Sequence, residues 1–529
     1  MKKYRPIVFS IVTSFLFITL CSMTSFLFPI HSRVDQNIFY TLGRGIIDGR
    51  VPYRDLFEHK GPLIYFFHAF AALINRHSFI GIYILEVAFF AVTVLFMFKT
   101  ARLFTGEKSA YIAALLSGAV CCTSFCFKVG DNAEEYCFAF LMISLYYLMR
   151  YFKSADRDLI GVGLNGKMIS MHTRLINYKV IFLNGILAGF VLWIKFIQLG
   201  FWIAWMGILF FVLILQKDYK RAFISCFVFL GSMAVTALPW IVYFGLNHAI
   251  GDWLTIYFYD NIVLYAKHVT AWEKISSLVN SFCKDFGQNP LAIFLILLGL
   301  VQFGIMKKYF KSRFGRLSVM LTFLTLYIMV YIGGVRYDYY MLIAIPFTLF
   351  GTIAVTDCVK SMPDMRLTRA VRYFTKKRGN VAAIGLCTVI VTGYVALASN
   401  AFPYYGKSKS DFPQYQFAEI INQKPGATLL NYGFIDGGFY LASGIEPLPG
   451  NKFFCKVNIS QKVFPEMYEE QISMVAERKV DYVVIRIWKG QDIEHGMRLD
   501  YEDLFNNYKI IAAADDPFES YRFFLLEQK

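Results

Sequence analysis

Charged residues are scarce in this chain of 529 residues, at 17% of the total. Soluble domains carry about 25% charged residues. Apolar residues make up 57% of the chain and aromatic residues 18%. This composition excludes an ordinary soluble protein and predicts a polytopic α-helical membrane protein.

The spacing of ligands that is typical of a tight metal site is also missing. The cluster Cys121-Cys122-x3-Cys126 does not match a zinc pattern and has no His nearby. Other cysteines lie mostly in or beside apolar segments. We therefore expect no cofactor and no metal site, although His59 and the carboxylates near it are possible ligands of a divalent ion.

Apolar runs of the length needed to cross a bilayer, about 20 residues, recur through the first three quarters of the chain. They predict eleven transmembrane helices, near residues 7–30, 79–98, 109–127, 134–152, 180–197, 199–216, 222–246, 291–306, 317–333, 338–357 and 380–399. The shorter apolar segment Leu63–Ile74 is expected to be re-entrant or interfacial.

The formal net charge of +16 reflects topology. With a cytoplasmic N-terminus, the Lys and Arg clusters within 99–108, 150–174, 217–221, 307–316 and 360–378 all fall in cytoplasmic loops. This distribution argues against nucleic-acid binding and favours a multi-pass protein of the bacterial plasma membrane. An odd number of spans places the C-terminus outside the cytoplasm.

From about Tyr404 the composition becomes that of a soluble domain. Residues 404–529 are predicted to form an extracytoplasmic α/β domain, and residues 1–403 the transmembrane domain, with 31–78 as its first extracytoplasmic loop. Helices are expected at 411–423 and 464–478, and strands at 427–432, 438–442, 480–488, 508–513 and 521–526.

Ionisable residues gather at span ends on the side predicted to be extracytoplasmic, where they indicate function by default. They are Asp35, Arg54, His59 and Lys60 in the first loop, Glu134 and Glu135, Lys195, and Arg336 with Tyr339 nearby. Each also has a purely structural interpretation, such as a helix cap for Asp35 or a pair with Asp338 for Arg336. Together they favour a site for a lipid phosphate with a polar headgroup, which makes membrane lipids expected partners.

The first loop resembles a known family. After Asp35, the sequence GRGIIDGRVPYRDLFEHKGPLIY (43–65) is similar to that of bacterial relatives of the protein O-mannosyltransferases, GT-C-fold enzymes that include the lipid A aminoarabinose transferase. Four more segments resemble family motifs: GDNAEEY (130–136), WIKFIQLG (193–200), GGVRYDYYMLIAIP (333–346) and Asn261-x3-Tyr265. Many relatives have a His-Tyr pair after the GG motif, where this chain has Asp338 and Tyr339. The role of that His is therefore not carried over.

The resemblance implies a GT-C-like catalytic domain over 1–403 that moves a sugar from a polyprenyl phosphate to an extracytoplasmic acceptor, either a cell-envelope glycan, a lipid or a protein. Asp35 would be the general base of a single inverting displacement. Lys195, Arg336 and Lys60 would stabilise the leaving phosphate. Substrate binding would also involve Arg54, His59, Glu134, Glu135 and Tyr339.

Two other functions are compatible with the composition. A transporter or flippase for a lipid-linked sugar would show paired repeats and ionisable residues at mid-membrane, whereas here no repeat is visible and the charges lie at span ends. A polysaccharide polymerase or ligase would use a diphosphate-linked donor and usually lacks a C-terminal soluble domain. A scaffold without activity would leave the polar first loop unexplained.

Overall fold

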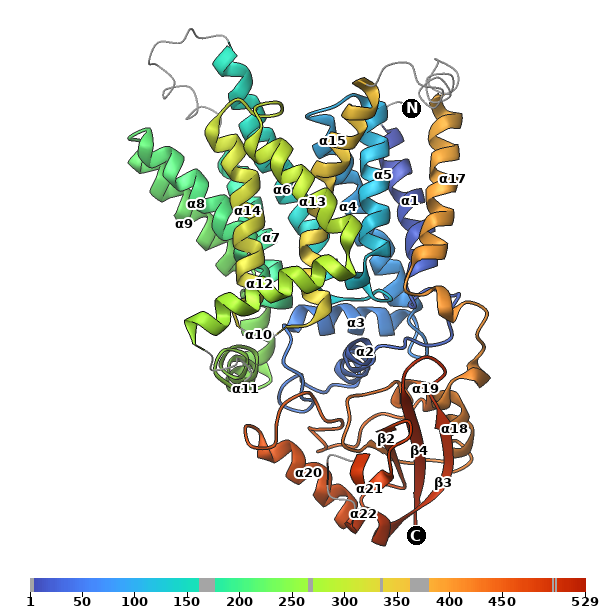
Figure 1. Cartoon of the computed structure of the whole chain (residues 1–529). Helices are drawn as coiled ribbons and strands as arrows, with labels where there is room; N and C mark the ends of the chain where they lie inside the picture. Colours follow the sequence, from blue (N-terminus) through green and yellow to red (C-terminus); the bar gives the residue numbers. More distant parts are fainter. Residues whose placement is uncertain are drawn as a thin grey trace. The chain divides into compact units, whose positions relative to one another are not determined.

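The computed structural model of the protein describes residues 4–160, 177–264, 270–333, 336–361, 380–496, 499 and 502–529 (Figure 1). It separates into two compact units, each made of segments that are distant in sequence. The first unit comprises Met1–Cys21, Glu86–Pro239 and Lys267–Phe402, and the second comprises Ser22–Leu85, Trp240–Ala266 and Pro403–Lys529.

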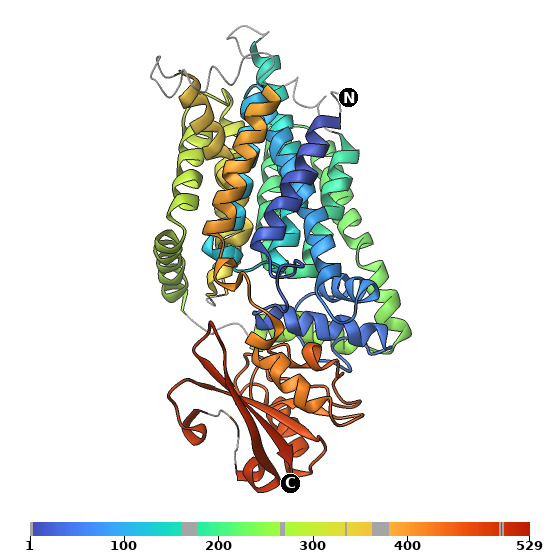
Figure 2. The same ribbon diagram turned by 90° about the vertical axis from the view of Figure 1, so that its right-hand side faces the viewer.

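The first unit is a bundle of mostly apolar helices. Its α-helices are α1 (Arg5–Cys21), α4 (Ile80–Arg102, from residue 86), α5 (Glu107–Thr123), α6 (Ala133–Ile160), α7 (Tyr178–Lys195), α8 (Gly200–Leu215), α9 (Tyr219–Val235), α12 (Ala271–Gln288), α13 (Pro290–Gly299), α14 (Arg313–Tyr331), α15 (Thr348–Ser361) and α17 (Asn380–Ala398). Shorter 3₁₀ or π segments are η2 (Phe125–Phe127), η4 (Phe196–Leu199), η6 (Leu300–Ile305) and η7 (Asp338–Phe347). Helices α1, α5 and α17 run side by side (Figures 1 and 2).

Each of the eleven predicted spans overlaps one or two helical elements. Within the described part of the chain, however, only five helical stretches are long and apolar enough to cross a membrane, or six if a bent pair counts as one span. Helices α7 and α8 form one such stretch, which is interrupted where Lys195 adopts an extended backbone (φ −159°, ψ 97°). The protein is a helical membrane protein, and the number eleven stays a prediction.

The predicted first span, 7–30, is wrong at its C-terminal end, because α1 stops at Cys21. The following side chains offer the backbone alternative hydrogen bonds, since the Ser22 hydroxyl lies 2.9 Å from that of Thr24 and accepts the Thr24 N–H. At 17 residues, α1 is about 26 Å long, slightly short of a bilayer core of about 30 Å.

The second unit combines two helices of the first loop with a small sheet. Its helical elements are α2 (Val34–Ile47), α3 (Pro62–Ile74), α10 (Leu238–Leu246), α11 (Ile250–Leu254), η5 (Thr255–Leu264), η8 (Phe402–Tyr404), η9 (Lys409–Asp411), α18 (Pro413–Ile421), α19 (Phe439–Ser443), α20 (Pro465–Ala476), α21 (Ile493–Gly496) and α22 (Glu502–Asn507). Its strands are β1 (Leu429–Asn431), β2 (Tyr482–Trp488), β3 (Tyr508–Asp515) and β4 (Tyr521–Gln528), in the order β1-β2-β4-β3. The β1–β2 pair is parallel and the other pairs are antiparallel.

Most of the elements predicted for residues 404–529 are confirmed, but the strand predicted at 438–442 is wrong. This segment forms helix α19, which is bounded by two glycines in the left-handed region, Gly438 (φ 90°) and Gly444 (φ 72°). Such residues start and stop a helix abruptly. Within α19, the Tyr440 hydroxyl donates to the Phe454 carbonyl at 2.8 Å, which holds the short helix in the core.

Helix α2 is joined to the C-terminal part of the chain by a buried arginine. Arg44 is 1% exposed, and its guanidinium donates to the Glu446 carboxylate at 2.6 Å. It also donates to the carbonyls of Ile445, at 2.6 Å, and Tyr440, at 3.3 Å. Nearby, the Thr41 hydroxyl donates to the buried Asp436 carboxylate at 2.8 Å. The helix that carries Asp35 is therefore part of the same core as α19.

Candidate active site

Three charged side chains meet in the second unit: Asp35, Glu58 and Lys60. Lys60 Nζ lies 3.8 Å from Asp35 Oδ2 and 3.5 Å from Glu58 Oε1. The side chain of Asp35 is 33% exposed, whereas those of Lys60 and Glu58 are 12% and 4% exposed. A nearly buried ammonium thus lies between a buried carboxylate and one that a substrate can reach.

Two helices in close contact hold this cluster. Asp35 lies in the first turn of α2, and Pro62 starts α3 directly after Lys60-Gly61. A Cβ atom on Gly43 of α2 would lie 2.5 Å from the carbonyl carbon of His68 on α3. Only glycine allows this approach, which fixes the two helices backbone to backbone.

The peptide that carries Lys60 is fixed independently of its side chain. The Lys60 carbonyl accepts hydrogen bonds from the hydroxyls of Tyr53, at 2.6 Å, and Tyr65, at 3.1 Å. Asn261 Nδ2 donates to the His59 carbonyl at 2.6 Å. Tyr53 adopts φ +70°, a conformation that costs energy in a non-glycine residue and that its buried contacts maintain.

Glu58 is the ionised anchor of the cluster. Burial alone would raise the pKa of its carboxyl, but the positive charges of Lys60 and His59 lower that pKa to about 2, with help from hydrogen bonds. These bonds come from the Tyr65 hydroxyl at 2.6 Å and the Lys60 N–H at 2.7 Å. The sequence places Glu58 among the ionisable residues of the first loop but assigns it no role, since its importance depends on partners that the fold brings to it.

The lowered pKa of Glu58 predicts an acid-dependent stability. Because the folded-state pKa of about 2 lies below the ordinary value of 4.5, the stabilisation is complete above pH 4.5 and is lost as the pH falls towards 2. We expect Glu58→Gln to lower the melting temperature of the purified protein at pH 7, and this deficit to shrink as the pH falls from 4.5 to 2.

Glu477→Gln is a matched control, because Glu477 pairs with Lys479 at 3.0 Å on the surface, where such pairs contribute little. This variant is expected to melt like the wild type at every pH. A Glu58→Gln protein whose deficit stays constant down to pH 2 would contradict the assigned ionisation.

The other predicted residues of the first loop differ in their surroundings. His59 Nδ1 lies 3.3 Å from Glu58 Oε1, so His59 belongs to the cluster. Arg54 instead pairs with Asp55 through two hydrogen bonds, at 2.7 and 2.8 Å, and donates to the Asn247 carbonyl at 2.6 Å. The structure thus groups Asp35, His59 and Lys60, and engages Arg54 elsewhere.

In the first unit, Lys195 and Glu134 are hydrogen-bonded and almost fully buried. The Lys195 ammonium also lies 3.9 Å from the centre of the Tyr340 ring and 5.1 Å from that of Tyr339. Aromatic faces and a carboxylate therefore surround the cation, which excludes the interpretation of Lys195 as a side chain that merely extends to water.

Arg336 and Glu135 contact different residues of the first unit. Arg336 pairs with Asp285 at 3.1 Å, so the expected pair with Asp338 is not formed. Asp285 also accepts a hydrogen bond from Tyr331 at 2.5 Å. Glu135 is 3% exposed, with Glu86 and Asp131 as charged neighbours.

Comparisons with known proteins gave one family match and several similar structures. Residues 59–194 match the model of the dolichyl-phosphate-mannose-protein mannosyltransferase family, so the match begins at His59-Lys60. The apo structure of ArnT from Cupriavidus metallidurans is similar with a TM-score of 0.60 at 10% identity, over 98% of this chain and 97% of that one. The chain has the GT-C fold of these glycosyltransferases. The predicted fold class is thereby confirmed.

Other solved structures are also similar to this chain. ArnT from the same organism bound to undecaprenyl phosphate gives a TM-score of 0.59 at 10% identity, with coverage of 98% and 97%. The oligosaccharyltransferase of Archaeoglobus fulgidus, tethered to an acceptor peptide, gives 0.46 at 12% identity, covering 98% of this chain and 74% of that one. A comparison with curated proteins found no match.

Sequence analysis missed a buried cation, Lys128. Lys128 Nζ lies 2.5 Å from Asp338 Oδ2 and 3.6 Å from the centre of the Phe125 ring. A signal was present, because Lys128 is a lone cation beside the acidic segment 130–136. Asp338 of this pair lies in the GGVRYDYYMLIAIP segment singled out above, next to Tyr339. Tyr265, of the predicted Asn261-x3-Tyr265 motif, lies outside the described residues.

Two further features concern ligands. Among the residues that the structure describes, no group of three or more His, Cys, Asp or Glu side chains could hold a metal ion.

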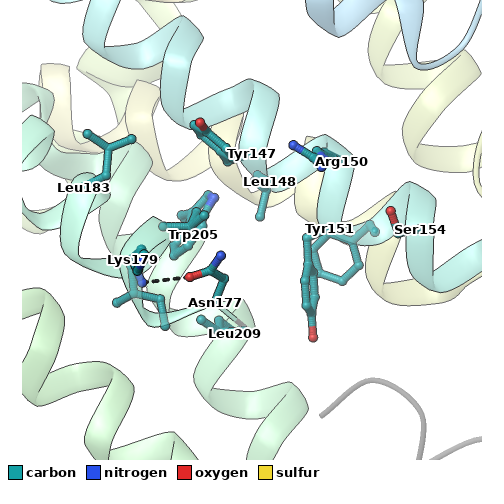
Figure 3. A pocket seen from close by; sticks show the side chains of 13 residues that line it. Tyr147, Leu148, Arg150, Tyr151, Ser154, Asn177, Lys179, Leu183, Trp205 and Leu209 are labelled. Atoms are coloured by element: carbon teal, nitrogen blue, oxygen red, sulfur yellow. Dashed lines mark hydrogen bonds between the residues drawn. The ribbon is translucent and has the colours of Figure 1, made fainter. Parts of the chain in front are cut away.

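A cavity of 520 Å³ lies between α6, α7 and α8, and its lining includes Tyr147, Tyr151 and Trp205 (Figure 3). None of the predicted site residues lines it.

Proposed function

We propose that this glycosyltransferase moves a sugar from a polyprenyl-phosphate donor to an extracytoplasmic acceptor at the plasma membrane of a bacterium, with residues 404–529 outside the cytoplasm. The observation that carries the proposal is the exposed carboxylate of Asp35, whose neighbour Lys60 lies 3.8 Å away at the start of the family match. The named family uses a lipid-phosphate sugar, and ArnT was solved with undecaprenyl phosphate.

The chemistry is a single displacement at the anomeric carbon. A hydroxyl oxygen of the acceptor forms the new glycosidic bond while the bond from the sugar to the phosphate oxygen breaks. Asp35 accepts the hydroxyl proton as the bond forms. The electron pair of the broken bond stays on the phosphate, and the lipid leaves as a phosphate monoester with one more negative charge.

A leaving phosphate needs positive charge more than it needs a proton. We assign this role to Lys195 and Arg336, with Lys60 as a third cation. Each of them already faces a carboxylate, so it is held in place before the donor arrives. Glu134 and Glu135 are assigned to sugar hydroxyls or to the acceptor. Tyr339, His59 and Arg54 are proposed as further substrate contacts.

The reaction is tested with purified protein, a synthetic polyprenyl-phosphate sugar and an envelope extract, together with mass spectrometry of envelope glycans from cells with and without the protein. We expect one envelope component to lose the mass of a sugar in cells that lack the protein, and to regain it in the purified reaction. Because the leaving group is a phosphate monoester, we propose that no metal is required, so EDTA should leave the rate unchanged. Identical glycan masses in both cell types would contradict the proposal.

A further inference from the structure

A cavity of 310 Å³ opens in the second unit between the start of α2 and the sheet. This volume falls in the lower part of the range typical of small-molecule sites, about 300–1,000 Å³. The residue Arg33 lines it and precedes Asp35 by two positions, so the Cα atoms of the two are at most about 7 Å apart. The cavity therefore begins next to the proposed general base.

One wall of the cavity is an aromatic and cationic surface on two paired strands. Trp488 of β2 is opposite Tyr521 of β4 in the sheet register, and their ring centres are 4.5 Å apart. The Arg486 guanidinium lies 4.2 Å from the centre of the Tyr521 ring. Trp488 is 48% exposed although it is among the largest apolar side chains of the unit. Flat, partly exposed aromatic rings beside a planar guanidinium suit the mixed apolar and polar faces of a sugar ring.

Buried polar groups complete the lining. Gln414 is 5% exposed, and its Nε2 donates to the Gly437 carbonyl at 2.8 Å. Its Oε1 is buried and has no hydrogen-bond partner in the described part of the chain. Lys456 is 6% exposed, with its ammonium 3.3 Å from the Val457 carbonyl. An amide oxygen without a donor is costly to bury, and a ligand hydroxyl would satisfy it.

Cations outnumber acids among the described residues that line the cavity. Among the described residues that line it, three are cations, Arg33, Lys456 and Arg486, and two are acids, Asp516 and Glu519. The Asp516 carboxylate accepts the backbone N–H groups of Phe518 and Glu519, at 2.9 and 2.8 Å. Glu519 lies 3.9 Å from Arg33. The Asp516 carboxylate thus holds the turn before β4 and Glu519 lies beside Arg33, and Arg486 and Lys456 place two further positive charges in the lining.

We propose that this cavity binds an acidic saccharide segment of the acceptor, one that bears a carboxylate or phosphate. The proposal rests on the proposed function, because it presents that acceptor to Asp35. It gives residues 404–529 a substrate-binding role. The aromatic wall contacts the sugar ring, Arg486 and Lys456 contact its acidic group, and Gln414 accepts from a hydroxyl.

The test measures binding of two defined probes to the full-length protein in nanodiscs by calorimetry. The probes are a tetrasaccharide of galacturonic acid and the uncharged maltotetraose. We expect the acidic probe to bind, with an affinity that falls as salt is added, and the neutral probe to bind at least tenfold more weakly. Arg486→Gln and Trp488→Ala should each weaken the acidic probe at least tenfold.

Arg522→Gln is the matched control. Arg522 lies between Tyr521 and Phe523 on β4, does not line the cavity, and pairs with Asp515 at the surface. It should bind the acidic probe like the wild type. No binding of the acidic probe, equal binding of both probes, or equal weakening by Arg522→Gln would each overturn the proposal.

An Asp35→Asn arm separates this proposal from the proposed function. That variant should bind the acidic probe normally while being inactive in transfer. Normal probe binding with full transfer by Asp35→Asn would refute the base and leave the cavity assignment standing. Loss of transfer in Asp35→Asn, with no probe binding in any variant, would refute the cavity assignment alone.

Discussion

Replacing Asp35 by Asn is expected to reduce the rate of sugar transfer by about 10²- to 10⁴-fold, the usual contribution of a general base. The amide keeps the shape of the side chain but cannot accept the hydroxyl proton. Because Asp35 is one third exposed in the first turn of α2, the variant should fold normally. The loss should fall on kcat, with little change in KM for the donor, and single-turnover kinetics would measure it.

Asp48→Asn provides the matched control in the same loop. Asp48 pairs with Arg76 through hydrogen bonds of 2.8 and 2.7 Å, both side chains are partly exposed, and neither has been assigned to the chemistry. Its activity should stay within about twofold of the wild type, as is usual for a surface change. Transfer by Asp35→Asn at the rate of this control would remove Asp35 from the role of base.

Lys195→Met is expected to raise the apparent KM for the donor by about 10- to 100-fold, the value of one charge-assisted hydrogen bond to a phosphate. The variant also leaves the buried Glu134 carboxylate without its cation, which by itself destabilises a protein. The double variant Lys195→Met with Glu134→Gln removes both charges and should restore thermal stability. It should not restore donor affinity, and Lys195→Arg should restore part of it.

The control for this series lies on the same helix. Lys179, at the exposed start of α7, is 16 residues from Lys195, a distance of about 24 Å along the helix. Lys179→Met should leave the donor KM unchanged. If the double variant regained both stability and donor affinity, Lys195 would have a structural role only.

Local patterns were sufficient to predict most helices and strands β1 to β4, and they marked Asp35 and Lys60, which the structure places 3.8 Å apart, as candidate site residues. Partners that lie far apart in sequence were not predictable in the same way. Arg336 pairs with Asp285 rather than the nearby Asp338, and the choice depends on where α12 lies against α14. The surroundings of Glu58 depend on the loop that brings the Lys60 N–H to its carboxylate. They also depend on Tyr53, which belongs to the same loop and has a positive φ.

Two predictions were wrong for local reasons that do not appear in a hydropathy profile. An apolar run continues past Cys21, but the hydroxyls of Ser22 and Thr24 end the helix there. The segment 438–442 has the composition of a strand, yet left-handed glycines at both ends make it a single helical turn. In both cases side-chain hydrogen bonds or backbone geometry overrode the apolar pattern.

The buried Arg44 of α2 implies that the order of synthesis and the order of folding differ. A chain made from its N-terminus produces α2 early. The carboxylate that pairs with Arg44 belongs to Glu446, and the carbonyls that accept its hydrogen bonds belong to Tyr440 and Ile445. Until about 400 further residues have been added, this guanidinium has no route into the core. The first loop is therefore among the last parts of the protein to reach its final packing, because it must wait for residues 440–446 to be made.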